Sequence, residues 1–339
     1  MVEKILNTDR NRLLEVRNLR TSFFTHKGEV KAVNHINFHV DRGEIVAIVG
    51  ESGCGKSVLQ MSVIQLVQSP PGKILGGDVI FDGQEILKHK PDSREMRSIR
   101  GAQISMIFQE PMTALNPVFT IGNQISEVIR VHTGVSAKKA WQIGIEALES
   151  VGIPDPGERM KCYPFEMSGG MRQRVVIAVA IACRSKLIIA DEPTTALDVT
   201  IQAQVMELLL GLTKQNNMSM IVVTHNLGLV SRYADRIYVM YAGQIMEAGS
   251  TEEILTNPKH PYTLGLLKSV PDLESEKGIK LVPIVGSPPS LTDLPPCCPF
   301  LPRCPYAAKE CKQERFPIIN EAGTKSHFSA CLRDTEVFR

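Results

Sequence analysis

The chain has 339 residues, of which 43% are hydrophobic, and its 38 lysines and arginines nearly balance its 36 aspartates and glutamates. A single core stops growing at about 250 to 300 residues, so we expect one large domain and a smaller appendage. The net charge of +2 gives no sign of the basic surface that nucleic-acid binding usually needs, and we expect no nucleic-acid partner. The longest apolar run, Val175–Cys183, is shorter than the roughly 18 residues of a bilayer span. Residues 1–18 lack the apolar core of a secretory signal, which predicts a cytoplasmic protein without membrane spans.

The first predicted elements are strands. Leu14 and Val16 alternate with polar residues, as do Ile36, Phe38 and Val40, and both segments predict half-buried antiparallel strands. Ile45–Val49 is a continuous apolar run that ends in a glycine-rich loop. Such a run is typical of a central strand in a parallel sheet.

The middle of the chain predicts helices and two further buried strands. Between about residues 121 and 153 one apolar stripe follows a helical period: Ala140, Ile143, Ala147, Leu148 and Val151. Leu187–Ala190 and Met220–Val223 are predicted to be buried strands. The helix between them has the apolar stripe Ile201, Val205, Leu208 and Leu212. Strand, helix and strand in this order indicate a right-handed parallel crossover.

The last seventy residues have a different composition. Frequent prolines after about Leu267 interrupt any long helix, and they predict a small, loop-rich second domain. Five of the eight cysteines lie between Cys297 and Cys331. In a cytoplasmic chain, clustered cysteines hold metal more often than they form disulfides.

The loop after Ile45–Val49 has the pattern of a phosphate-binding loop. It consists of Gly50, Glu51, Ser52, Gly53, Cys54, Gly55, Lys56 and Ser57. Glycines in such a loop turn backbone N–H groups onto phosphates, Lys56 neutralises the β and γ oxygens, and the Ser57 hydroxyl can bind magnesium. A glycine-rich structural turn is the weaker alternative, because a predicted strand and helix flank the loop. The loop predicts ATP or GTP binding but does not separate kinases, GTPases and transport ATPases.

Other polar groups follow the predicted strands at their carboxyl ends, where parallel sheets bind ligands. Asp191 suits a magnesium site, and Glu192 can polarise an attacking water as a general base. His225 can hold the γ-phosphate and that carboxylate in register, and Gln109 can reach magnesium and water from a loop. Ser168-Gly169-Gly170 opens an apolar helix, with Ser168 as its N-cap and two glycines that allow an anion to approach the backbone.

These motifs, taken together and in order, resemble those of the ATP-binding-cassette (ABC) ATPases over about residues 12–260. The set is Lys56 with Ser57, Gln109, Ser168-Gly169-Gly170, Asp191-Glu192, Ala196-Leu197-Asp198 and His225. The resemblance implies an α/β P-loop fold with a mainly parallel sheet, an antiparallel β subdomain and a helical subdomain at about 112–165. It also implies ATP and Mg²⁺ as cofactors, with Ser57, Gln109 and Asp191 at the metal and Asp198 among the nucleotide-site residues.

In this family two cassettes bind head to tail, so the resemblance places Ser168 and Gly170 against the γ-phosphate held by a partner's loop. A lone cassette is then expected to have little activity. The family pattern has Gln after the two glycines, whereas this chain has Met171 and loses any contact made by that Gln side chain. Phe23, with Phe24 as the alternative, would stack on adenine; an ordinary core role for either is equally compatible with strand alternation.

Three local segments narrow the resemblance to the peptide-importer branch, which also includes nickel importers. They are residues 110–117 (EPMTALNP), 260–263 (HPYT) and 298–305 (CPFLPRCP). The branch implies a second homologous ATPase subunit, two transmembrane permease subunits and an extracytoplasmic solute-binding protein. The chain would lie on the cytoplasmic face of the membrane, with an ATPase domain at 1–267 and a cysteine-rich domain at 268–339. The region around Gln109–Pro117 and the helical insertion would receive a coupling helix of the permease, although Met112, Leu115, Trp141 and Met160 can equally be core residues.

Other classes fit less well. A soluble ABC protein acting on ribosomes or DNA typically carries two cassettes or a coiled-coil insertion, and this chain has one motif set. A redox enzyme would need a second cofactor motif. An exporter motor stays open, although the C-terminal extension argues against it by resemblance. Import of nickel or another solute in place of peptides stays open.

Four of the terminal cysteines are predicted to ligate a [4Fe–4S] cluster: Cys298, Cys304, Cys311 and Cys331. A metal staple would compensate for a proline-rich segment with little core, and the resemblance favours the same assignment. Structural zinc sites usually begin with two cysteines two to four residues apart, whereas the gaps here are five, six and nineteen residues. Cys297 could replace Cys298, His327 could replace one thiolate, and free buried thiols are the remaining alternative.

Overall fold

The computed structural model describes residues 11–109, 114–194, 199–269, 283–312, 320–321 and 326–333. The chain folds into two compact units. The first unit combines Met1–Leu87 with Val223–Arg339, and the second unit is Lys88–Val222. Within the described ranges, no helix combines the length and the apolar character that a bilayer span requires.

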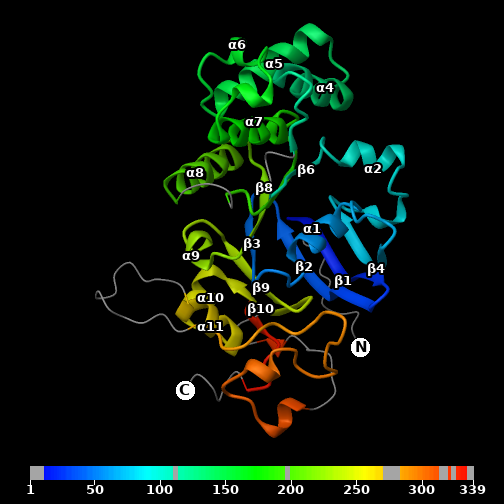
Figure 1. Cartoon of the computed structure of the whole chain (residues 1–339), viewed down its shortest axis with the longest axis vertical. Coiled ribbons are helices and arrows are strands. Elements are labelled where there is room, and N and C mark those ends of the chain that lie inside the picture. Colours follow the sequence, from blue (N-terminus) through cyan, green and yellow to red (C-terminus); the bar gives the residue numbers. More distant parts are fainter. Residues whose placement is uncertain are drawn as a thin grey trace. The chain divides into compact units, whose positions relative to one another are not determined.

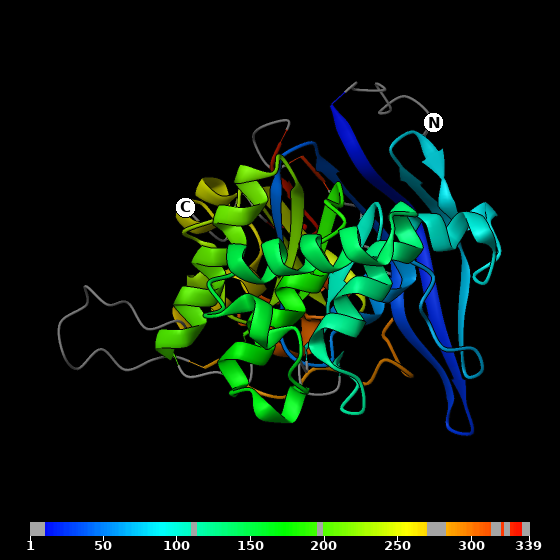
Figure 2. The same cartoon turned by 90° about the horizontal axis from the view of Figure 1, so that it is seen from above.

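The first unit opens with an antiparallel sheet in the order β2-β1-β4-β5. Its strands are β1 (Arg12–Thr25), β2 (Gly28–Asp41), β4 (Gly72–Phe81) and β5 (Gln84–Glu85). Figure 2 shows β1 and β2 as the long blue ribbon of this sheet. The alternating residues Leu14, Val16, Ile36, Phe38 and Val40 are all buried, which confirms the prediction of two antiparallel strands with one inward face.

A second set of strands in the same unit carries the glycine-rich loop. In this set β3 (Ile45–Val49) pairs in parallel with β9 (Arg236–Tyr241), which pairs antiparallel with β10 (Gln244–Ser250). Beyond β10, β12 (Phe328–Ser329) and β11 (Asn320–Glu321) add two short antiparallel strands. Every residue of β3 is buried, as the continuous apolar run predicts. The parallel pairing of β3 with β9 agrees with the predicted parallel sheet, and the antiparallel strands beyond β9 make it mixed.

The helices of the first unit are short. They are α1 (Lys56–Val63), α9 (Leu227–Val230), α10 (Thr251–Thr256) and α11 (Pro261–Ser269). After α11 the described residues form only the 3-10 turns η3 (Leu301–Arg303) and η4 (Lys309–Lys312) besides β11 and β12. This loop-rich character agrees with the proline content. The boundary between a large and a small domain near residue 267 stays a prediction.

The second unit gathers most of the helices around one parallel strand pair, β6 (Ile104–Ile107) and β7 (Leu187–Asp191). Its longer helices, labelled in Figure 1, are α4 (Ile121–Thr133), α5 (Ala137–Ser150), α7 (Gly169–Ile181) and α8 (Val199–Gln215). Shorter ones are α2 (Arg94–Ile99), α6 (Pro156–Arg159) and the 3-10 turn η2 (Pro164–Glu166). The 3-10 turn η1 (Ile86–Lys88) begins in the first unit and ends in the second, and β8 (Ser219–Thr224) begins in the second and ends in the first.

The predicted helical stretch at 121–153 is two helices. Gly134 ends α4 in the left-handed conformation (φ 70°), and Ser136 starts α5 by accepting a hydrogen bond from the Lys139 N–H. Leu115 and Met160 are buried, so they serve the core, and Trp141 is half-buried. Met112 lies outside the described residues.

Candidate functional site

Two glycines of the Gly50–Ser57 loop let it pack directly on backbone. A Cβ atom at Gly50 would lie 2.1 Å from the carbonyl oxygen of Met240 in β9. One at Gly55 would lie 2.1 Å from the carbonyl oxygen of Ala32 in β2, and Gly55 also has a left-handed φ of 102°. Only glycine meets both requirements at Gly55, so the loop conformation is fixed by residue type.

Lys56 and Ser57 open α1 immediately after this turn. The Lys56 side chain is 5% exposed, and its ammonium donates to the carbonyl oxygens of Gly50 and Glu51 at 2.9 and 3.0 Å. It is therefore held within the loop. Free N–H groups and the positive end of the dipole lie at the start of a helix, so lysine and helix together suit a phosphate.

The second unit brings two predicted catalytic residues together. The Gln109 side-chain amide donates to a Glu192 carboxylate oxygen at 3.0 Å. Glu192 directly follows Asp191, the buried last residue of β7, and has a left-handed φ of 45°. A non-glycine residue in this conformation is strained, and such strain is concentrated at functional sites. Gln109 and Glu192 thus form a polar pair at the carboxyl end of β7, next in sequence to the buried Asp191.

The Ser168-Gly169-Gly170 segment behaves as predicted at the start of α7. The Ser168 hydroxyl accepts a hydrogen bond from the Met171 N–H at 3.3 Å. A Cβ atom at Gly169 or Gly170 would meet nothing within 4 Å, so this helix start is open. Further along α7, the buried Gln173 donates to the carbonyl oxygen of Pro193 at 2.6 Å and ties the helix to the residue after Glu192.

The remaining predicted site residues are described one by one within their own units. His225 is exposed and follows β8 in the first unit. Phe23 is half-buried beside Gly72, whereas Phe24 is 52% exposed. Asp198 lies outside the described residues. The phosphate loop and His225 belong to the first unit and the Gln109–Glu192 pair to the second, so their grouping into one site stays a prediction.

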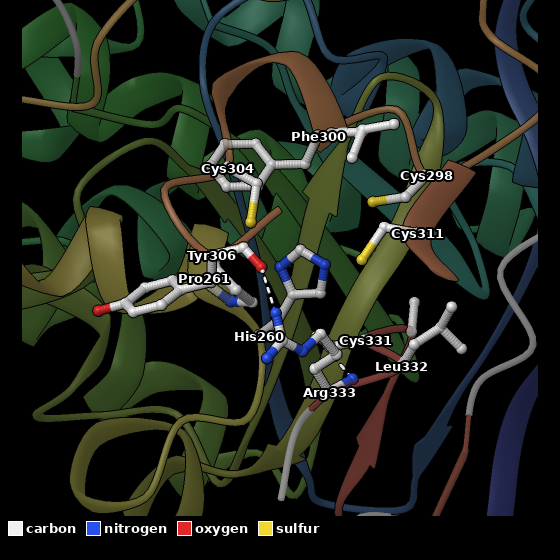
Figure 3. Close-up of a pocket in the computed structure, with 12 residues that line it drawn as sticks. His260, Pro261, Cys298, Phe300, Cys304, Tyr306, Cys311, Cys331, Leu332 and Arg333 are labelled. Carbon is white, nitrogen blue, oxygen red and sulfur yellow. Dashed lines mark hydrogen bonds between the residues drawn. The ribbon is translucent and has the colours of Figure 1, made fainter. Parts of the chain in front are cut away.

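The four predicted cluster cysteines line one pocket in the first unit. Cys298, Cys304, Cys311 and Cys331 surround it with His260 and aromatic and aliphatic side chains. Figure 3 shows the sulfur atoms of Cys298, Cys304 and Cys311 directed into the same space around the His260 ring. The four cysteines therefore converge although their spacing in sequence is irregular.

The thiol chemistry of this pocket reflects burial and mutual proximity. Burial raises the pKa of Cys298 to about 11, and the neighbouring Cys304 and Cys311 raise it further. Burial likewise raises the pKa of Cys331 to about 12, again with contributions from the other three cysteines. Without a compensating cation Cys298 and Cys331 are neutral thiols at neutral pH.

The two residues named as alternative ligands lie outside the lining of this pocket. Cys297 does not line it, whereas Cys298 does, and the choice between them as a ligand stays a prediction. His327 is buried elsewhere, with its Nε2 2.7 Å from a carboxylate oxygen of the buried Glu247. Among the described residues, no group of three or more His, Cys, Asp or Glu side chains is arranged to hold a metal ion. Four cysteines line one pocket, but no metal-binding geometry accompanies them, so the cluster stays a prediction.

Sequence reasoning missed how the C-terminal segment reaches the glycine-rich loop. The Arg303 guanidinium donates to both carboxylate oxygens of Glu51, at 2.6 and 3.0 Å. The Tyr262 hydroxyl accepts a hydrogen bond from the Glu51 N–H at 2.9 Å. Neither partner follows from periodicity, because the contacts span 252 and 211 residues of chain.

Comparison with known proteins covers both halves of the chain. A family model described as "ABC transporter" matches residues 33–195. A second, described as "Oligopeptide/dipeptide transporter, C-terminal region", matches residues 246–311. The second match contains the pocket residues Cys298, Cys304 and Cys311, as well as Arg303 and Tyr262.

Several curated relatives are similar over nearly their whole length. The oligopeptide transport ATP-binding protein OppD of Bacillus subtilis is 50% identical over 313 residues, which is 92% of this chain and 87% of OppD. The dipeptide transport ATP-binding protein DppD of the same organism is 50% identical over 300 residues, covering 88% of this chain and 89% of DppD. OppD of Salmonella typhimurium is 48% identical over 326 residues, covering 96% and 95%.

Solved structures agree on the fold. The dimeric post-hydrolysis state of the ATP-binding cassette MJ0796 bound to ADP and Pi superposes with a TM-score of 0.62 at 25% identity, covering 70% of this chain and 99% of that one. The predicted P-loop fold with an antiparallel sheet and a helical region is thereby confirmed. With relatives near 50% identity along almost its whole length, the chain belongs to the ABC ATPases of the oligopeptide/dipeptide transporter family and is the ATP-hydrolysing motor subunit of an importer.

Proposed function

We propose that this subunit couples ATP hydrolysis to the uptake of di- or oligopeptides. The observation that carries the proposal is the identity of about 50% with OppD and DppD, which extends through the C-terminal region. For ATP hydrolysis the proposal relies on Glu192, whose carboxylate can act as the general base. The Gln109 amide donates a hydrogen bond to this carboxylate at 3.0 Å and holds it in place.

The test is transport by the assembled importer in vesicles. Two permease subunits, the homologous ATPase subunit and the solute-binding protein are reconstituted with this chain, and uptake of labelled di- and oligopeptides is measured with and without ATP. We expect ATP-dependent peptide uptake, and none with Lys56→Ala, which removes the phosphate counter-charge. ATP-dependent uptake of nickel without peptide uptake would overturn the proposed substrate class.

Within the nucleotide site we assign roles on chemical grounds. The glycine-rich loop with Lys56 would hold the β and γ phosphates, and Phe23 would stack on adenine. Bound Mg²⁺ would neutralise phosphate charge, with Ser57, Gln109 and Asp191 as its protein ligands.

The catalytic roles follow the same chemistry. Glu192 would accept the proton of the attacking water, and His225 would orient that carboxylate and the γ-phosphate. Asp198 would lie at the same site. The open start of α7, Ser168-Gly169-Gly170, would complete the site of a head-to-tail partner, because helix N-termini with room for an anion bind phosphate.

We also propose that a permease helix docks on an apolar patch of the second unit. The patch consists of Val118, Phe119, Tyr163 and Phe165, whose exposed fractions include 70% for Val118 and 69% for Phe165. Backbone hydrogen bonds from Ile121 to Cys162 and from Gly122 to Met160 keep the two segments adjacent. The Tyr163 and Phe165 rings are stacked with centroids 5.5 Å apart, and exposed apolar groups gathered on neighbouring segments are typical of a protein-binding site.

This docking surface can be tested against an equally exposed control. Phe165→Ser should weaken association with the permease and lower transport while ATP binding by the isolated chain stays parental. Val131, 71% exposed on α4 and outside the patch, provides the control substitution Val131→Ser. Equal loss of association in both variants would refute the patch. Docking would place the chain on the cytoplasmic face of the membrane as a peripheral subunit.

For the C-terminal region, which we assign as a domain at 268–339, we propose a [4Fe–4S] cluster held by Cys298, Cys304, Cys311 and Cys331. The support is the donor chemistry, four thiols around one pocket. A cluster places each thiolate on a separate iron, whereas a zinc ion holds all its ligands at about 2.0 to 2.3 Å from one centre. When bound, the group would supply structural cross-linking in a segment of short 3-10 turns.

Anaerobic purification tests the cluster. We expect brown protein with iron and acid-labile sulfide in equal amounts, and loss of both on Cys304→Ser or Cys311→Ser. Cys162→Ser, which alters a cysteine of the second unit, is the control and should keep the iron. Colourless protein with one zinc per chain would overturn the assignment.

A further inference from the structure

One residue of the glycine-rich loop is held from three directions. The Glu51 side chain receives both hydrogen bonds of the Arg303 fork, at 2.6 and 3.0 Å. Its N–H donates to the Tyr262 hydroxyl at 2.9 Å, and its carbonyl oxygen accepts from Lys56 at 3.0 Å. Two of these contacts come from the C-terminal part of the chain, so the loop geometry depends on residues far from the loop in sequence.

Arg303 is itself fixed by its surroundings. Its side chain is 5% exposed and donates to the carbonyl oxygens of Ile284 and Val285, at 3.2 and 3.1 Å, and to the Tyr241 hydroxyl at 3.2 Å. The guanidinium carbon also lies 5.8 Å from the centre of the Tyr241 ring. A planar fork with this many partners has one orientation, and lysine cannot reproduce it.

The same cluster joins the loop to the cysteine pocket. Arg303 immediately precedes Cys304, and Phe300 lies between Cys298 and Arg303 in sequence. The Phe300 ring packs against Tyr241 and Tyr262 at centroid distances of 5.4 and 5.3 Å, and Phe300 also lines the pocket. The residues that hold Glu51 are thus packed on the residues that carry the thiols.

The negative charge of Glu51 affects how the loop can bind phosphate. Glu51 is the second residue of a loop that binds phosphate, and an uncompensated carboxylate there would repel the phosphate through a partly buried, weakly screened region. The Arg303 fork neutralises the carboxylate and holds it in one orientation, with the Glu51 side chain 26% exposed. A bidentate pair of this kind is also among the stronger polar contacts in proteins.

We infer that Arg303 is a positioning residue of the nucleotide site: through Glu51 it sets the charge and conformation of the phosphate loop, so the cysteine-bearing segment forms part of that site. The inference rests on the proposed nucleotide site. It adds to that site a residue, Arg303, that would act through Glu51 without touching the phosphate. On this inference the chain needs its C-terminal segment to bind nucleotide, whether or not that segment also contacts other subunits.

A charge-removal cycle tests the inference on the full-length chain. The dissociation constants of ADP and ATP are measured for the parental protein, Arg303→Met, Glu51→Gln and the double variant, alongside thermal unfolding. Arg303→Met leaves the carboxylate unpaired and should raise both constants roughly tenfold, the factor that corresponds to about 1.4 kcal/mol. Adding Glu51→Gln removes the unpaired charge, so the double variant should bind several-fold more tightly than Arg303→Met.

Arg333→Met is the matched control, since Arg333 lines the same pocket and contacts Tyr306 and Glu310 but not the loop. It should leave both dissociation constants parental. If Arg303 only stabilised the fold, Arg303→Met would lower the unfolding temperature without changing nucleotide affinity, and the double variant would be no better than the single. Either result overturns the inference, whereas failure of the parental chain to bind ADP or ATP would instead refute the nucleotide site itself.

Discussion

Glu192 occupies a strained backbone position at the end of β7, with a φ of 45°. Its carboxylate accepts a hydrogen bond from Gln109, and the following residue, Pro193, is held by the buried Gln173. A side chain held at both ends in an unfavourable conformation suits a reacting group, because the surrounding contacts offset the backbone cost.

Glu192→Gln should therefore bind ATP with parental affinity and hydrolyse it at least about a hundredfold more slowly, since the amide keeps the shape and removes the base. Phosphate release and equilibrium nucleotide binding measure the two effects separately. Glu207→Gln, an exposed carboxylate on α8, is the control. Parental turnover in Glu192→Gln would assign the base to another group.

The buried His39 makes the stability of the folded chain depend on pH. Burial lowers its pKa from 6.5 to about 4, and its Nδ1 lies 3.3 Å from the Tyr238 hydroxyl. The charged groups that act on it are Arg12 and Arg236, which lower the pKa, and Asp41 and Glu15, which raise it. Burial dominates, so the folded state keeps this imidazole neutral.

Because the unfolded state takes up the proton first, this contribution to stability is complete above pH 6.5 and is lost as the pH falls towards 4. For this histidine the free energy of unfolding should drop by about 2 kcal/mol between about pH 6 and pH 4.5. Denaturant unfolding at several pH values should show a shallower loss for His39→Gln, while His26→Gln, at an exposed position, keeps the parental slope. Identical slopes in all three proteins would contradict the assignment.

At the level of elements, local patterns predicted the first three strands and the buried strands β7 and β8, but not β4, β9 or β10. The segment around Leu14 and the apolar run at Ile45–Val49 both form the predicted strands. In the first, alternating apolar residues specify one buried face, and in the second a continuous apolar run specifies a strand buried on both faces. The turn at Gly134 was missed, since the predicted stripe begins only at Ala140 and does not show where the preceding helix ends. The Arg303–Glu51 contact could not be predicted, because pairing between segments 252 residues apart leaves no periodic pattern.

Two glycines on helices of the second unit predict opposite effects of the same substitution. Gly211 lies inside α8, and a Cβ atom added there would meet nothing within 4 Å, so Gly211→Ala should raise stability by up to about 1 kcal/mol through helix propensity. At Gly122 the added carbon would lie 2.6 Å from the Met160 carbonyl oxygen and from the Trp141 ring. Gly122→Ala should therefore lower stability by about 1 to 3 kcal/mol. Denaturant midpoints of the two variants check both signs, and a stabilising Gly122→Ala would refute the close packing.

On the scale of the whole molecule, the start of α7 is where we propose that a second chain completes the site. Gly169 and Gly170 have unfilled space around them, although the rest of α7 is largely buried. A helix start with room for an anion suits a phosphate, and the proposed head-to-tail pairing would supply that phosphate from the partner's nucleotide.

The isolated chain should accordingly be mostly monomeric with low ATPase activity, which rises when the homologous partner and the permease subunits are added. Gly170→Asp separates the two roles: the new side chain has room within its own chain, and an aspartate near a helix start is favourable for the fold. Its charge would face the phosphates held by the partner chain, so monomer nucleotide affinity should stay parental while the assembly-dependent activity is lost. Gly157→Asp, at a similarly open position in α6, should preserve that activity. Full ATPase activity in a demonstrably monomeric parental sample, measured by light scattering and phosphate release together, would show that the site is complete within one chain.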